Sequence, residues 1–187
     1  YKNAIANLPL GGGKAVIIGD PAKDKTEARL LAYGRAVNEL GGRYITAMDV
    51  GITPADMPVI ARATKHAAGF DMPGKPSGDS GPPTALGVFV GLKAAIKHRL
   101  GADSAKGLTV AIQGLGKVGT NLAKRLHDEG AKLIVSDVNA DAVKKAVGAF
   151  GAKPVSADEI VTAECDVFSP NALGAILNDK TVDKIDR

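Results

Sequence analysis

The residues of this chain best suited to chemistry are a lysine behind a run of glycines and an aspartate further along the chain. Lys14 directly follows Gly11, Gly12 and Gly13, and Asp49 comes later in an apolar context. Backbone without side chains can come close to a small ligand. A lysine held there can be desolvated, which lowers the pKa of its ammonium group toward the range used in acid–base catalysis. Taken alone, Gly11 to Lys14 fit a flexible turn with a solvated lysine better than a catalytic site.

The composition is that of an ordinary folded protein and disfavours two classes of partner. Hydrophobic residues make up 45% of the 187 residues and charged residues 24%, which allows one large or two small domains with a sizeable core. The net charge is +4, but the basic residues are scattered and only 4% of residues are aromatic, so no nucleic-acid surface is expected. No run is long and apolar enough to span a bilayer, so no membrane partner is expected.

Cysteine and histidine usage indicates a reducing compartment and no metal site. Cys165 is the single cysteine, which excludes an intrachain disulfide and predicts a cytoplasmic location. Because it leads into a largely apolar run, we expect a buried structural thiol. His66, His98 and His127 lie on separate predicted helices without ligand spacing beside a carboxylate, so no metal is expected.

The elements that must position Lys14 and Asp49 can be read from the first part of the chain. Its apolar patterns predict a buried strand over 15–18, a helix over 26–40, a strand over 43–47 and a helix from 53 onward. The second strand delivers Asp49 at its C-terminal end. The charged segment 21–26 alternates in sign, so we interpret it as a solvated loop that leads into the first helix.

The stretch 69–83 is the most irregular and holds four of the ten prolines, so a domain boundary or a cleft-lining hinge is expected there. We predict a substrate-binding α/β domain over 1–79 and a second domain over 80–187. The expected elements of the second domain are a helix over 84–100, then strands over 108–112, 132–135, 154–155 and 166–168 alternating with helices over 118–129, 140–150 and 157–162. This alternation predicts a Rossmann-like, doubly wound parallel sheet.

A glycine fingerprint follows the first strand of that second domain. Gly114, Gly116 and Gly119 form G-x-G-x-x-G between an apolar strand and a helix, the context that gives the pattern its meaning. Gly114 would allow the tight turn, Gly116 the approach of a pyrophosphate and Gly119 close contact between helix and strand. The helix N-terminus supplies N–H groups for the phosphates. We therefore predict a dinucleotide site that also includes Lys117 and Val118, where the helix begins.

Asp137 follows the second strand of that domain and bears on which dinucleotide binds. A carboxylate there can accept hydrogen bonds from the adenosine ribose, notably from its 2′-hydroxyl. It would repel the additional phosphate of NADP, so we predict NAD. The alternative function of Asp137 is to cap the following helix.

With both halves in view, the chain resembles the glutamate, leucine, phenylalanine and valine dehydrogenase family. The resemblance runs nearly end to end through segments 1–4, 10–21, 42–51, 84–88, 114–119 and 165–170. It implies an NAD-dependent oxidoreductase that acts on an amino acid and assembles as a homo-oligomer. We interpret the chain as the middle part of a longer protein, lacking the N-terminal part of the first domain and the C-terminal part of the second. It begins at Tyr1 without methionine and ends soon after an apparent strand.

The resemblance also implies the functions of individual residues. Lys14 corresponds to the catalytic lysine and Asp49 to the catalytic aspartate, while Lys2 corresponds to the lysine that binds the substrate α-carboxylate. Thr84 matches the threonine that contacts the nicotinamide carboxamide, and Ala47 would leave space for an aliphatic substrate side chain. A lysine–aspartate pair suits this chemistry, because oxidation of an amine to a carbonyl needs proton transfers at two heteroatoms.

The implied reaction converts an L-amino acid, NAD and water into a 2-oxo acid, ammonia and NADH. Segments 17–21 and 46–51 are similar to the leucine, valine and phenylalanine branch rather than the glutamate branch. Met48, Ile52, Ala68 and Asn171 depart from the residues common in leucine enzymes, so the preferred amino acid stays open. The alternatives are a glutamate-type enzyme and a dinucleotide-binding module without catalysis. Lys2, Lys14 and Asp49 together argue against a module, which has no use for that set.

Overall fold

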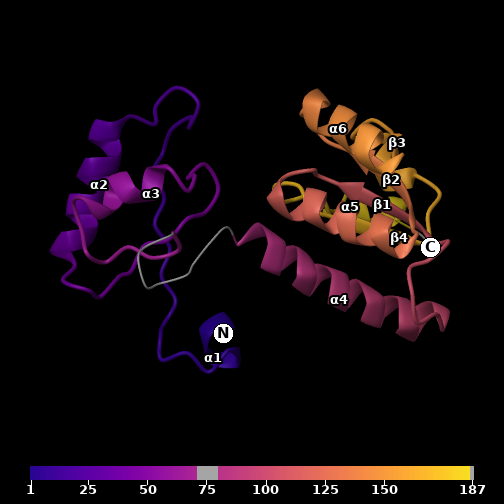
Figure 1. The fold of residues 1–187 in the computed structure, drawn as a ribbon, viewed down its shortest axis with the longest axis horizontal. Helices are drawn as coiled ribbons and strands as arrows, with labels where there is room; N and C mark the ends of the chain where they lie inside the picture. Colours follow the sequence, from indigo (N-terminus) through magenta and orange to yellow (C-terminus); the bar gives the residue numbers. More distant parts are fainter. Residues whose placement is uncertain (71–79, 186–187) are drawn as a thin grey trace. The chain divides into compact units, whose positions relative to one another are not determined.

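The computed structural model describes residues 1–70 and 80–185. Contacts divide the chain into two compact units, Tyr1–Asp79 and Ser80–Arg187, and each has its own hydrophobic core (Figure 1). Most of the irregular stretch expected at a domain boundary, residues 71–79, lies outside the described residues.

Unit 2 is built on a sheet of four parallel strands. The strands are β1 (Thr109–Gln113), β2 (Lys132–Ser136), β3 (Lys153–Pro154) and β4 (Val167–Pro170). They lie in the order β3-β2-β1-β4, and Val110 of β1 pairs with both Leu133 and Val167. Because the chain crosses over β1 between β3 and β4, the carboxyl ends of β1 and β4 form a switch point of the sheet. The predicted parallel, alternating architecture is confirmed.

Helices cover both faces of this sheet. They are α4 (Gly81–Leu100), α5 (Lys117–Glu129), α6 (Ala140–Phe150) and α7 (Glu159–Thr162), followed by a short 3-10 turn, Val182–Lys184. α4, α5 and α6 lie side by side in Figure 1. Side chains of β1 alternate between the two faces, so that Ile112 packs with residues of α4 and α5, whereas Ala111 packs with Ile160 and Val161 of α7.

The sequence of α5 explains why it packs onto the sheet. Gly119, Leu122, Ala123 and Leu126 recur at helical spacing and are all buried, which gives one apolar face. Leu122 and Leu126 are fully buried, and each such side chain contributes about 1.5–3 kcal/mol. That packing fixes the start of the helix, where the glycine fingerprint lies.

Unit 1 consists of short helices joined by long connections. The helices are α1 (Lys2–Ile5), α2 (Glu27–Glu39) and α3 (Asp56–Ala61). Thr26 caps the N-terminus of α2, because its side-chain oxygen accepts a hydrogen bond from the Arg29 N–H. Leu30 of α2 packs with Met57 and Ile60 of α3 in the core of the unit, and this contact holds the two helices together.

The strands predicted over 15–18 and 43–47 are wrong. The isolated parallel bridge between Thr46 and Ala67 is the pairing found within residues 1–70, and residues 15–18 form no strand. Val16 and Ile18 are 77% and 92% exposed instead of buried. An extended apolar segment becomes a strand only when another strand satisfies its backbone groups, and the first segment has no such neighbour among the described residues.

Two smaller expectations also need correction. Lys25 belongs to the charged segment interpreted as a solvated loop, yet its side chain is only 22% exposed and forms an ion pair with Asp56. Cys165 is half-buried rather than fully buried, at the edge of the cluster around Ile160.

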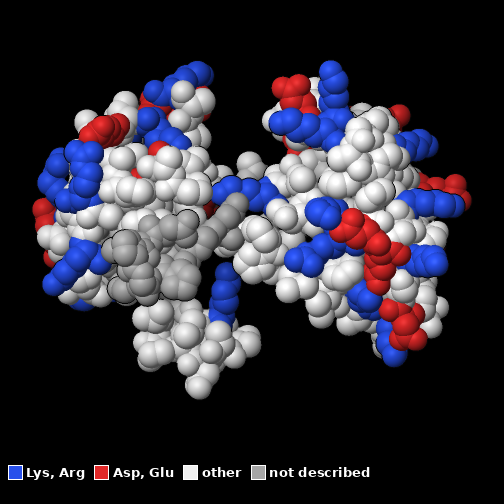
Figure 2. Space-filling model, in the orientation of Figure 1, with Lys and Arg blue, Asp and Glu red and all other residues white. Residues whose placement is uncertain are grey.

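No helix among the described residues is long and apolar enough to cross a membrane. Figure 2 shows basic and acidic side chains interspersed on the visible face of unit 2.

Candidate active site

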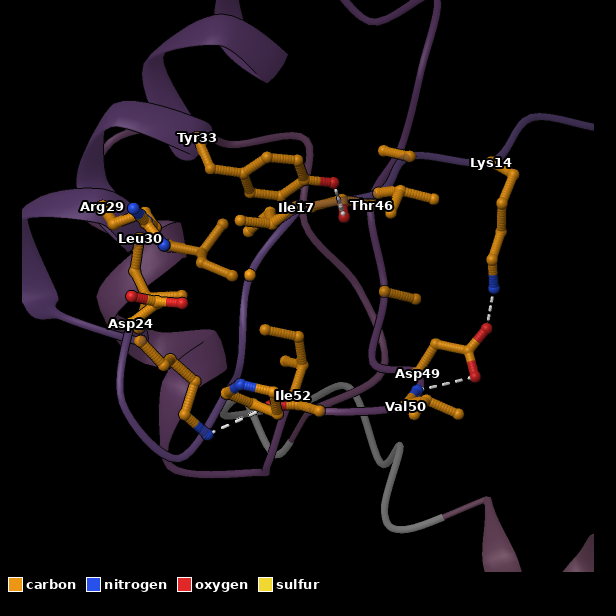
Figure 3. Close-up of a pocket in the computed structure, with 18 of the residues that line it drawn as sticks. Lys14, Ile17, Asp24, Arg29, Leu30, Tyr33, Thr46, Asp49, Val50 and Ile52 are labelled. Atoms are coloured by element: carbon orange, nitrogen blue, oxygen red, sulfur yellow. Dashed lines mark hydrogen bonds and ion pairs between the residues drawn. The ribbon is translucent and has the colours of Figure 1, made fainter. Parts of the chain in front are cut away.

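Lys14 and Asp49 meet in unit 1, at one side of a pocket. The Lys14 ammonium group forms an ion pair with the Oδ2 atom of Asp49 (Figure 3). Both residues and Ala47 line a pocket of about 420 Å³. The side chains of Lys14 and Asp49 are 66% and 56% exposed, so the desolvation expected for Lys14 is not found. The pair can exchange a proton between a nitrogen and an oxygen, as an acid–base site requires.

A tight turn presents Asp49 to Lys14. The Ile52 N–H donates to the Asp49 carbonyl oxygen at 3.0 Å, and Gly51 between them has a φ of +81°. A turn of this kind needs a residue that tolerates positive φ, which glycine does without strain. The Val50 N–H donates to the Asp49 Oδ1 atom at 2.8 Å. The backbone therefore holds one carboxylate oxygen while the other meets Lys14.

The wall of the pocket away from Lys14 combines apolar side chains with polar and charged ones, among them Asp24, Lys25 and Arg29. Leu30 and Ile60 line it, and the Tyr33 hydroxyl lies 2.7 Å from the Thr46 hydroxyl (Figure 3). Burial raises the pKa of Tyr33, which keeps the phenol neutral. Sequence reasoning missed Tyr33 and Thr46. Tyr33 lies one turn from the buried Leu30 on α2, and no spacing in the sequence distinguished either Tyr33 or Thr46.

Lys2 is not brought to this pocket. It is the first residue of α1 and is not among the residues that line the pocket around Lys14. The side-chain amide of Asn3 donates to the Gly11 carbonyl oxygen, which ties α1 to the glycine run before Lys14. Of the residues expected in the first domain, the structure thus brings together Lys14, Ala47 and Asp49.

The fingerprint in unit 2 has the geometry that a dinucleotide turn requires. Gly114 has a φ of +94°, and a Cβ added there would lie 2.5 Å from the Ala172 nitrogen. A Cβ on Gly119 would lie 1.9 Å from the Gly114 carbonyl oxygen, so the first helical turn touches the end of β1. A Cβ on Gly116 would meet nothing within 4 Å. Backbone atoms therefore fill the space beside Gly114 and Gly119, whereas the space beside Gly116 is open, so that a pyrophosphate fits there.

Asp137 ties the end of β2 to the fingerprint. Its Oδ2 atom accepts a hydrogen bond from the Leu115 N–H at 2.5 Å, and its Oδ1 atom accepts one from the Asn139 N–H at 2.7 Å. The side chain of Asn139 caps α6, so the alternative function predicted for Asp137, capping that helix, belongs to Asn139. A carboxylate has about four acceptor positions, which leaves Asp137 able to accept further hydrogen bonds.

The remaining residues expected at the cofactor site lie at helix starts. Thr84 is exposed in the first turn of α4, Lys117 is exposed at the start of α5, and Val118 beside it is half-buried. Asn171 lies at the switch point, where its N–H donates to the Gln113 carbonyl oxygen at 2.6 Å. Its position directly after the last strand was the signal that could have placed it beside the fingerprint.

No group of three or more His, Cys, Asp or Glu side chains within residues 1–70 and 80–185 could hold a metal ion.

Comparisons with known proteins agree on one family. The model of the Glu/Leu/Phe/Val dehydrogenase dimerisation domain matches residues 1–66, and the Glutamate/Leucine/Phenylalanine/Valine dehydrogenase model matches residues 79–148. The chain is 52% identical to a leucine dehydrogenase of Geobacillus stearothermophilus over 99% of this chain and 50% of that protein. It is 46% identical to a valine dehydrogenase of Streptomyces albus over 97% of this chain and 51% of that protein.

Solved structures give the same result. The crystal structure of an L-tryptophan dehydrogenase from Nostoc punctiforme superposes with a TM-score of 0.70 and 44% identity, covering 98% of this chain and 52% of that one. The chain spans about half the length of the curated relatives it matches. Two matched domain models in sequence order, an ion-paired lysine and aspartate, and a dinucleotide turn on a parallel sheet converge on one conclusion: the chain belongs to the glutamate/leucine/phenylalanine/valine dehydrogenase family.

Proposed function

We propose that the protein containing this chain oxidatively deaminates a branched-chain or aromatic L-amino acid to its 2-oxo acid and ammonia, with NAD as the cofactor. The observation that carries the proposal is the ion pair between Lys14 and Asp49 beside a pocket that apolar side chains line together with several charged ones. The names of the relatives, leucine, valine and L-tryptophan dehydrogenase, support an apolar substrate side chain.

The proposed functions of Lys14 and Asp49 follow from their contact. When bound, a nicotinamide dinucleotide would supply the acceptor for the hydride that leaves the substrate Cα, so that an imine results. Within the pair, the Lys14 ammonium group passes a proton to Asp49, and the neutral Lys14 so formed takes a proton from the water that attacks the imine carbon. Asp49 gives its proton to the nitrogen and accepts the proton of the new hydroxyl group as the carbonyl forms and ammonia leaves. The turn at Gly51 holds Asp49 so that one oxygen faces Lys14. By the family resemblance we assign the substrate carboxylate to Lys2, which does not line this pocket in the structure, and Ala47 leaves room for the substrate side chain.

The fingerprint residues are proposed to hold the cofactor. Gly114, Gly116 and Gly119 form the turn against the pyrophosphate, with Lys117 and Val118 at the helix start, and Thr84 contacts the nicotinamide carboxamide. The family uses NAD or NADP, and we propose NAD for this protein because of Asp137. Its carboxylate stands at the end of β2 beside the fingerprint, where a negative charge repels a 2′-phosphate and accepts hydrogen bonds from the free hydroxyl.

We also propose that the protein is a cytoplasmic homo-oligomer organised as a substrate domain over 1–79 and an NAD-binding domain over 80–187. The description of the family model over residues 1–66 as a dimerisation domain supports the oligomer. The single cysteine supports a reducing compartment.

The experiment follows NADH formation by protein that contains residues 1–187, with L-leucine, L-valine, L-phenylalanine, L-tryptophan and L-glutamate, and with NAD or NADP. Turnover of an apolar amino acid with NAD is expected, and Lys14→Ala should lower kcat about 10²- to 10⁴-fold while the Kd for NAD, measured by calorimetry, stays unchanged. Turnover confined to glutamate would identify the glutamate-type enzyme. Bound NAD without turnover of any substrate would leave a nucleotide-binding module, and equal rates with NADP would contradict the assignment of Asp137.

A further inference from the structure

Lys25 and Asp56 form an ion pair that is far less exposed than the pair between Lys14 and Asp49. The Lys25 Nζ atom lies 2.7 Å from the Asp56 Oδ2 atom, and the two side chains are 22% and 15% exposed. Lys25 also donates to the Gly51 carbonyl oxygen at 3.1 Å. The Lys25 ammonium group therefore binds two residues that follow it by 26 and 31 positions in the chain, Gly51 and Asp56.

Asp56 holds the same loop from the other side. Its Oδ2 atom accepts hydrogen bonds from both the N–H and the hydroxyl of Thr53, each at 2.7 Å. Asp56 is the first residue of α3, whose Met57 and Ile60 are fully buried in the core of the unit. Lys25 stands directly before Thr26, the cap of α2. The loop from Gly51 to Thr53 is thus fastened to the starts of two packed helices.

This loop is continuous with the turn that carries Asp49. Gly51, whose carbonyl oxygen Lys25 binds, is the third residue of the turn that starts at Asp49. Ile52 closes that turn by donating to the Asp49 carbonyl oxygen, and Thr53 follows it directly. If the Gly51 carbonyl oxygen and the Thr53 N–H are held, the turn has little freedom to rotate Asp49 away from Lys14.

We propose that Lys25 and Asp56 are positioning residues, which hold the turn bearing Asp49 in the orientation that meets Lys14. The proposal rests on the function proposed above for Lys14 and Asp49. Asp56 is not among the residues that line the pocket, whereas Lys25 is, and the function proposed for both is to hold the turn. A reacting group misplaced by about 1 Å can cost about 100-fold in rate. Loss of the contacts that Lys25 and Asp56 make with the loop should therefore lower kcat more than it changes the affinity for the cofactor.

The test compares Lys25→Met with Lys25→Arg and with the control Lys23→Met, in protein that contains residues 1–187. Methionine keeps the length of the side chain without its charge, and arginine restores a cation that can reach both acceptors. Lys23 is two residues away but 82% exposed, with an ion pair to Asp20. The readouts are kcat, the KM for NAD, and amide hydrogen exchange at Ile52 and Thr53.

The expected result has two parts. Lys25→Met should lower kcat about 10- to 100-fold with the KM for NAD within about twofold, and exchange at Ile52 and Thr53 should become at least about tenfold faster. Lys25→Arg should recover most of the rate, and Lys23→Met should match the wild type. If Lys25→Met does not fold, Asp56→Asn, which keeps an acceptor for Thr53 but loses the charge, should show the same changes in smaller measure.

Other outcomes overturn the proposal. Unchanged exchange at Ile52 and Thr53 in Lys25→Met would show that Lys25 does not hold the turn. Faster exchange with an unchanged kcat would show that holding the turn does not matter for Asp49. Absence of turnover in the wild type, with NAD bound, is a different failure: it refutes the proposed function, while the exchange measurements still decide whether Lys25 and Asp56 fasten the loop.

Discussion

The glycines of the fingerprint permit a prediction whose size can be worked out from the structure. In Gly119→Ala, the new Cβ would lie 1.9 Å from the Gly114 carbonyl oxygen, whereas ordinary contact begins at 3.4 Å. The shortfall, 3.4 − 1.9 = 1.5 Å, equals the rise of one residue along an α-helix. Helix α5 cannot move that far without separating Leu122 and Leu126 from the sheet, against which both are fully buried.

Gly119→Ala should therefore reduce the free energy of unfolding by about 3 kcal/mol, the upper end of what overpacking costs. With an ordinary dependence on urea, the midpoint should fall by about 1 to 3 M. Two matched substitutions in the same unit separate this clash from the general effect of adding a methyl group. A Cβ on Gly148 of α6 or on Gly116 meets nothing within 4 Å. Gly148→Ala should stabilise by about 0.5–1 kcal/mol, because alanine favours helix.

Gly116→Ala is the informative member of the series. Gly116 has φ −69° and ψ −163°, which alanine also adopts, so stability should stay within about 0.5 kcal/mol. Its methyl group would occupy the open side of the turn, and affinity for NAD should fall at least about tenfold, or about 1.4 kcal/mol. Urea unfolding and calorimetry measure the two quantities. An unchanged midpoint for Gly119→Ala would refute the close contact at Gly114, and unchanged NAD affinity for Gly116→Ala would refute the place given to the pyrophosphate.

Two further predictions concern ion pairs. Burial alone would raise the pKa of Asp56, but hydrogen bonds from Lys25 and Thr53 outweigh it and lower that pKa. The contribution of Asp56 to the stability of the folded state is therefore present above the ordinary carboxyl pKa and is lost as the pH falls through the lowered pKa. Urea midpoints measured from about pH 5 to pH 3 should thus fall more steeply for the wild type than for Asp56→Asn, and parallel curves would contradict this. Lys93 of α4 lies 2.5 Å from Glu129 of α5, which is 19% exposed. Lys93→Met should lower the free energy of unfolding by about 1–3 kcal/mol, because it leaves that carboxylate without its cation. Lys97→Met removes an ion pair whose side chains are more than 70% exposed and should change that free energy by at most about 1 kcal/mol. Equal losses in the two variants would refute the importance of burial.

Sequence patterns were sufficient in unit 2, where each predicted strand pairs with another strand of the same unit. The strand at 109–113 finds its neighbours at 132–136 and 167–170 within the same unit, so apolar runs and helical spacing determined the parallel sheet. The fingerprint was predictable because its residues lie next to one another in the chain. Its glycine spacing reflects a contact between a helix and the strand immediately before it, as Gly119 and Gly114 show.

The same reasoning failed in unit 1 because an apolar run does not reveal whether it has a neighbour. The pattern over 15–18 is typical of a strand, yet no described strand lies beside it. Long-range polar pairs were out of reach as well. Lys25 looked like one charge of a solvated loop, and its partner Asp56 is 31 residues away. Tyr33 and Thr46 pair in the pocket, but neither belongs to a motif with a recognisable spacing.

Two carboxylates, one missed by sequence reasoning and one predicted only as a cofactor contact, hold the loops that carry the predicted functional residues. The sequence indicated Asp49 and the fingerprint as functional, and in each case a carboxylate from further along the chain fastens the loop. Asp56 accepts from the Thr53 N–H beyond Asp49, and Asp137 accepts from the Leu115 N–H inside the fingerprint. A carboxylate that binds a backbone N–H fixes the loop itself rather than one side chain, because every residue of the loop moves with its backbone. Substitution of either acid should therefore disturb the function of residues it does not touch.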